Sequence, residues 1–114
     1  MKYAVVKADG SHEVVETEKR LSLQQIQELV AAPGEVGATF QAVGGPNVTI
    51  LMNENGKYLP LGTNMSVTQY ARDRALIWPH DDIRGDCIIV GEPDDEGYEK
   101  DVVDEVLNDI LAYS

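Results

Sequence analysis

Few residues in this chain are of types that could carry out chemistry: one cysteine, two histidines and a cluster of acids towards the C-terminal end. A nucleophilic cysteine needs a lowered pKa and a partner base, and such cysteines are typically found at exposed helix N-termini. Cys87, the only thiol, lies within the apolar run Cys87-Ile88-Ile89-Val90, which favours a buried structural role. The alternative is a small enzyme or ligand-binding domain with a pocket near His80–Cys87, formed with Asp81 and Asp82.

The acidic run 94–97 is calcium-like in composition. If Gly97 takes position 6 of a calcium-binding loop, position 12, which requires a bidentate glutamate, is Val103. Zinc is less plausible, because one cysteine and two distant histidines do not form a ligand set at a recognisable spacing. We therefore expect no metal, no cofactor and no catalytic residue.

The charge of the chain is concentrated at one end. The 20 acids and 9 bases give a formal net charge of −11. Residues 1–80 contribute −1 of this charge, and residues 81–114, with twelve acids and two bases, contribute −10. Direct binding to nucleic acid or to an anionic membrane is disfavoured, because phosphate contacts need clustered Lys and Arg.

This acidic end has three interpretations. It could be a solvated face whose first acids stabilise a helix dipole. It could dock a basic partner of host or phage, since a concentrated field speeds and orients association; a DNA-binding partner would make the chain a DNA mimic. The last helix could also form a homodimer.

We predict a non-enzymatic interaction protein that uses this acidic surface. A lone tryptophan is a typical anchor of protein interfaces, so Trp78 is included. The candidate partner-binding residues are Asp94, Asp95, Glu96, Asp101, Asp104, Glu105, Asp109 and Trp78.

The 114 residues are enough for one domain, spanning 1–114, with a real core. A single cysteine fits a reducing compartment. No apolar run approaches the roughly 20 residues of a membrane span, and the chain opens on a strand rather than on a secretory leader. We expect a cytoplasmic protein.

Hydrophobic periodicity predicts an α+β fold with a mixed or antiparallel sheet. Strands are expected at 2–8, 12–17, 35–43, 48–52 and 87–90. Helices are expected from Ser22 to about Ala32, from Ser66 to about Ala75, and from about Glu99 to Ala112. Capping boxes, Ser22 with Gln25 and Ser66 with Gln69, predict the first two helix starts.

The last helix has the clearest amphipathic pattern. Its apolar positions are Val103, Val106, Leu107, Ile110 and Leu111, and its polar positions are Asp101, Asp104, Glu105, Asn108 and Asp109.

Two stretches carry short patterns of turn and strand. They are Asn53-Glu54-Asn55-Gly56-Lys57, followed by Leu59-x-Leu61-x-x-Asn64, and Asp82-Ile83-Arg84-Gly85-Asp86-x-Ile88-Ile89-Val90-Gly91-Glu92. The chain thereby resembles a small domain-of-unknown-function family that is common in bacteriophage, plasmid and actinobacterial genomes. The resemblance covers roughly residues 2–97, leaves the final helix outside, and implies an intracellular α+β protein of a mobile element or its host, with no known catalytic residues to transfer.

Overall fold

The computed structural model describes all residues, 1–114, as five strands, three α-helices and one short 3₁₀-helix. The strands are β1 (Lys2–Val6), β2 (His12–Glu16), β3 (Phe40–Gly45), β4 (Val48–Asn53) and β5 (Cys87–Val90). The helices are α1 (Leu23–Val30), η1 (Gly56–Tyr58), α2 (Met65–Asp73) and α3 (Asp104–Leu111). All strand pairs are antiparallel, in the order β2-β1-β5-β4-β3. The predicted α+β fold is confirmed.

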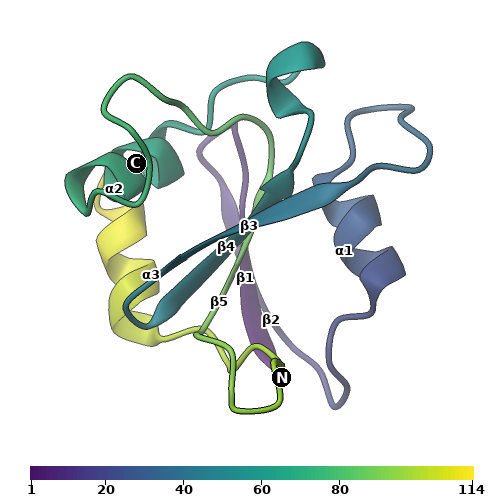
Figure 1. Ribbon diagram of the computed structural model, residues 1–114, viewed down its shortest axis with the longest axis vertical. Helices are drawn as coiled ribbons and strands as arrows, with labels where there is room; N and C mark the ends of the chain where they lie inside the picture. The colour runs from purple at the N-terminus through teal and green to yellow at the C-terminus, as the bar shows by residue number, and fades with distance from the viewer.

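Helices cover both faces of the sheet: α2 and α3 pack on one face and α1 on the other (Figure 1). The central strand β5 contributes to both cores, because successive side chains of a strand point to opposite faces. Cys87 and Ile89 lie in the core under α2 and α3, and Ile88 and Val90 lie in the core under α1. No helix combines the length and the apolar character needed to cross a membrane.

The first predicted helix start is confirmed and the second is wrong. Ser22 caps α1, and the reciprocal bonds of the capping box with Gln25 are both present. The cap of α2 is Asn64, whose side-chain oxygen accepts from the amide of Val67. Ser66 lies inside the helix, because the side-chain amide of Asn64 is held by the carbonyls of Val6 and Gly85 at 2.8 and 3.0 Å. These partners are distant in sequence, so local pattern could not identify the cap.

The third strand begins later than residue 35, where the sequence placed it. Gly34 and Gly37 have positive φ, so the chain turns here instead of extending. Glu35 accepts hydrogen bonds from the amide of Ala32 and the side chain of Asn53, at 2.9 and 2.8 Å. It thus ties the end of α1 to β4.

The last helix also begins later, at Asp104 rather than near Glu99. The preceding residues are extended, because the amide of Lys100 donates to the carbonyl of Glu92 and that of Val102 to the carbonyl of Lys2. Val102, rather than Val103, therefore enters the core. Of the predicted apolar face, Val106, Leu107 and Ile110 are buried against the sheet of their own chain.

Candidate functional site

The acidic loop 92–99 is a short antiparallel hairpin rather than the start of a helix. Its ends are joined by the bridge between Pro93 and Glu99. The carboxylate of Asp94 accepts the backbone amides of Tyr98 and Glu96, at 3.0 and 2.9 Å. These hydrogen bonds, that from Tyr98 first, hold the pKa of Asp94 below its usual value. Asp94 therefore shapes the loop.

Two further predicted acids join the start of α3 to the first strand. Asp101 accepts the backbone amide of Lys2 at 3.0 Å, and Asp104 accepts its ammonium group at 2.6 Å. The hydrogen bond to Asp104 raises the pKa of Lys2. Asp104 also lies in the first turn of α3, where a negative charge interacts favourably with the helix dipole.

Asp109 lies in the last part of α3, beside α2. Its carboxylate is 3.3 Å from the guanidinium of Arg74, which also covers the ring of Tyr70 at 4.0 Å. This predicted residue therefore takes part in the contact between the two helices.

Three of the predicted acids have no partner within the chain. Asp95, Glu96 and Glu105 are exposed, and their carboxylates form neither a hydrogen bond nor an ion pair. They are the acids free to meet another molecule.

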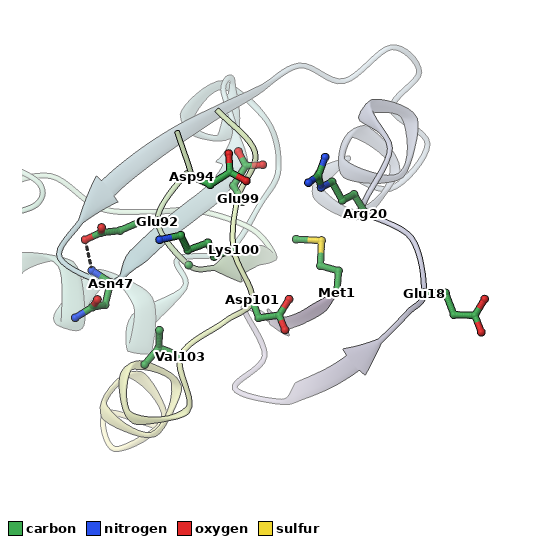
Figure 2. Close-up of a pocket in the computed structure, with 11 residues that line it drawn as sticks. Met1, Glu18, Arg20, Asn47, Glu92, Asp94, Glu99, Lys100, Asp101 and Val103 are labelled. Atoms are coloured by element: carbon green, nitrogen blue, oxygen red, sulfur yellow. Dashed lines mark hydrogen bonds between the residues drawn. The ribbon is translucent and has the colours of Figure 1, made fainter. Parts of the chain in front are cut away.

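An open cavity of about 620 Å³ lies beside the acidic loop (Figure 2). Figure 2 shows Glu92, Asp94, Glu99 and Asp101 on one side and Arg20 across the opening from them. The side chains that line it are Met1, Glu18, Arg20, Asn47, Glu92, Asp94, Glu99, Lys100, Asp101 and Val103. Sequence reasoning selected only Asp94 and Asp101 of these, because the others come from separate segments that carry no shared pattern.

A smaller, mainly apolar pocket of about 100 Å³ adjoins this cavity and shares Met1, Arg20 and Glu99 with it. Leu21, Ile26, Leu51, Val90 and Tyr98 complete its lining. The guanidinium of Arg20 lies 3.7 Å from the centre of the Tyr98 ring. Glu99 is thus a half-buried carboxylate at the junction of a polar and an apolar space.

Trp78 belongs to a different part of the surface. It follows α2, in a segment that lies far from the acidic loop in Figure 1, and its side chain is 72% exposed. It lines an open groove of about 590 Å³ with Val43, Leu76, Ile77 and Pro79. Trp78 and the acids of the loop therefore do not form one continuous site.

His80 and Cys87 are not brought together. His80 is exposed, whereas Cys87 is fully buried among apolar side chains, and neither lines any of the five main pockets. Burial raises the pKa of the Cys87 thiol well above its usual value, which is the opposite of what a nucleophile needs. No three His, Cys, Asp or Glu side chains are grouped to hold a metal ion.

The two stretches that carry the resemblance lie side by side. The amide of Asn64 donates to the carbonyl of Ile83 at 2.8 Å, and a Cβ at Gly56 would come within 3.2 Å of the Arg84 carbonyl. Gly85 has a φ of +86°, and Asp86 accepts the amide of Ala8 at 3.1 Å. The residue types in these two motifs are therefore accounted for by the turns and close contacts that they form.

The fold and the surface define an acidic α+β domain with helices on both faces of an antiparallel sheet. The chain belongs to the family described as Domain of unknown function (DUF3846), whose model matches residues 1–113. The match includes α3, which the resemblance seen in the sequence left out. No curated protein and no solved structure matches the chain.

Proposed function

We propose that this protein is a non-enzymatic binding domain that docks a basic partner protein through its acidic face. The acidic face consists of the acids that line the cavity and their acidic neighbours. The cavity acids are Glu18, Glu92, Asp94, Glu99 and Asp101, and the neighbours are Asp95, Glu96, Asp104 and Glu105. Arg20 and Lys100 are the basic residues of the cavity lining, and Lys2 is paired with Asp104. A predominantly negative surface of this kind attracts and orients a cationic partner.

The observation that carries the proposal is that the carboxylates of Asp95, Glu96 and Glu105 form no hydrogen bond and no ion pair within the chain. Exposed acids close to other acids raise the energy of the folded chain through like-charge repulsion. A partner with Lys or Arg at the interface would relieve this repulsion. The apolar pocket beside Glu99 would receive the aliphatic stem of such a side chain, because long basic residues bury their methylenes and keep their charge in a polar place.

The test is capture of partners from a lysate of the encoding cell, over a range of salt concentrations. Neutralising the free acids in the triple variant Asp95→Asn, Glu96→Gln, Glu105→Gln should remove the basic proteins that the native chain captures. The matched control is Glu13→Gln, Glu28→Gln, Glu54→Gln, which changes the net charge equally on other exposed surfaces. It should capture the same partners as the native chain.

Screening gives a second criterion. Added salt should weaken capture steadily, since exposed charges more than about 10 Å apart are largely screened at 0.1 M. Equal capture by both triple variants, or capture that does not respond to salt, would exclude the acidic face as the docking surface.

A further inference from the structure

The two edges of the sheet are protected to very different degrees. β2 and β3 are the edge strands. Natural proteins protect such edges with charged residues, prolines or bulges, because unpaired backbone groups invite another strand. β2 carries His12, Glu13 and Glu16, whereas no residue of β3 (Phe40–Gly45) is charged and none is proline. The edge formed by β3 is therefore open to strand pairing.

The backbone groups of β3 that face outward follow from its register. In an antiparallel ladder, alternate residues bond to the neighbouring strand and those between point away. The amide of Glu54 donates to the carbonyl of Thr39 at 3.0 Å, so the odd-numbered residues of β3 bond to β4. The backbone groups of Phe40, Ala42 and Gly44 then point away from the sheet, and no turn or loop hydrogen bond uses them.

The exposed groove lies against this same edge. Val43 of β3 forms one wall, and the apolar part of the rest comes from Leu76, Ile77, Trp78 and Pro79; Arg72, Ala75 and Asp81 complete the lining. An exposed tryptophan beside an open, uncharged strand provides apolar contact next to unpaired hydrogen-bonding groups. Together these features match the two requirements of a strand-addition site, which are main-chain bonds and pockets for side chains.

We infer that β3 pairs antiparallel with β3 of a second copy of this chain, to give a continuous ten-stranded sheet. A two-fold axis perpendicular to the sheet keeps α2 and α3 of both copies on the same side. The groove and Trp78 of one copy then lie on the same side of the sheet as those of the other, next to β3 of the other copy. With Ala42 opposite its counterpart, Phe40 of one copy lies opposite Gly44 of the other. The outward-facing backbone groups of one β3 therefore meet the outward-facing backbone groups of the other.

The absence of charge on β3 favours a second copy over a basic partner at this edge. The edge strand itself is uncharged, so pairing places no like charges opposite one another, and it offers no acid to a cationic chain. The carboxylates of the nearest turn are already paired, Asp81 with Lys57 and Asp82 with Arg84. The acidic face stays available for the partner proposed above, on which this inference does not depend.

The test is the oligomeric state, measured by sedimentation from low-micromolar to near-millimolar protein. We expect a weak dimer that strengthens with salt, because salt screens the repulsion between two chains of charge −11. Docking of a basic partner should respond to salt in the opposite direction. Ala42→Pro removes an outward amide and should raise the dimer dissociation constant at least about tenfold.

The control is Val14→Pro, which removes an outward amide from the other edge strand and should leave the dimer intact. A reading on the unmodified chain uses hydrogen exchange: the amides of Phe40, Ala42 and Gly44 should become protected as concentration rises, and that of Val14 should not. Trp78→Ala should weaken the dimer as well. Three results would each overturn the inference: a monomer under every condition, a dimer unchanged by Ala42→Pro, or edge amides that stay unprotected. A monomer or unprotected edge amides would instead point to an extended segment of another protein as the occupant of this edge.

Discussion

Two buried asparagines, Asn53 and Asn64, connect loops to the core through their side-chain amides. Asn53 donates to the carbonyl of Val30 and to Glu35, which fixes the end of α1 against β4. Asn64 donates to the carbonyls of β1 and of the segment before β5, and caps α2 as well. A buried side-chain amide whose hydrogen bonds are all formed stabilises the fold. If the amide is removed, the buried carbonyls that it bonded are left without a donor, which costs free energy.

Replacing Asn64 by alanine should therefore destabilise the protein by about 2–4 kcal/mol, because the helix cap is lost and two buried carbonyls lose their donor. Ser66→Ala is the comparison, since the sequence suggests Ser66 as the cap and the structure does not. It should cost less than about 1 kcal/mol. Urea denaturation of both variants measures the difference, and a larger loss for Ser66→Ala would contradict the assigned cap.

The carboxylate of Asp94 should make stability depend on pH. Its pKa is lowered in the folded state, so its ionised form adds stability above the ordinary value of 3.8, and this contribution is lost as pH falls through the lower, folded value. Asp94→Asn should be less stable than the native chain at neutral pH, and the difference should shrink towards acid pH.

Asp95→Asn provides the control for Asp94→Asn. It removes one charge from the same loop without removing an acceptor of backbone amides. Thermal unfolding between about pH 2 and pH 7 would show the effect. A pH-independent difference between native chain and Asp94→Asn would show that the hydrogen bonds do not depend on ionisation.

The elements near the C-terminal end show how a correct periodicity can still place a helix start wrongly. The amphipathic pattern of α3 is real, because Val106, Leu107 and Ile110 are buried. The residues before Asp104 satisfy their backbone groups through the first strand and the acidic loop rather than through the helix. Residues 100–102 thus act as an added extended segment at the margin of the sheet.

This arrangement predicts which of two adjacent valines matters. Val102 is 5% exposed and Val103 is 36% exposed. Val102→Ala should cost about 1.5–3 kcal/mol, from lost burial and the cavity left behind, and Val103→Ala less than about 1 kcal/mol. Denaturant unfolding distinguishes them. A helix that began near residue 99, with Val103 on its buried face, would give the reverse order.

At the scale of the whole molecule, the charge is a cost to folding that the contacts only partly offset. Lys2, Lys57, Arg74 and Arg84 each form an ion pair with an aspartate, but all four pairs are partly exposed and such pairs contribute little. The free acids have no such compensation.

Neutralising Asp95 and Glu96 together should therefore stabilise the isolated protein at low salt, by a few tenths of a kcal/mol per residue. The gain should fall as salt is added. Thermal unfolding at low and high salt measures both effects. A loss of stability in this double variant would show that Asp95 and Glu96 support the fold, which would contradict a role reserved for a partner.

The sequence by itself determined the features that depend on near neighbours. Alternation in Cys87–Val90 assigned these residues correctly to two faces, and the Ser22 capping box placed the start of α1, because both depend on bonds within one strand or one turn. The sequence also shows directly that the acids are concentrated after residue 80.

Only the tertiary structure decided which residues meet across the chain. Asn64 rather than Ser66 caps α2, because the carbonyls of Val6 and Gly85 hold the side-chain amide of Asn64 in place. The tertiary structure also gathered Glu18, Arg20 and Glu99 around one cavity and placed Trp78 elsewhere, beside an open strand. Strand order and the packing of distant segments fix such contacts, and no local pattern of residues specifies either.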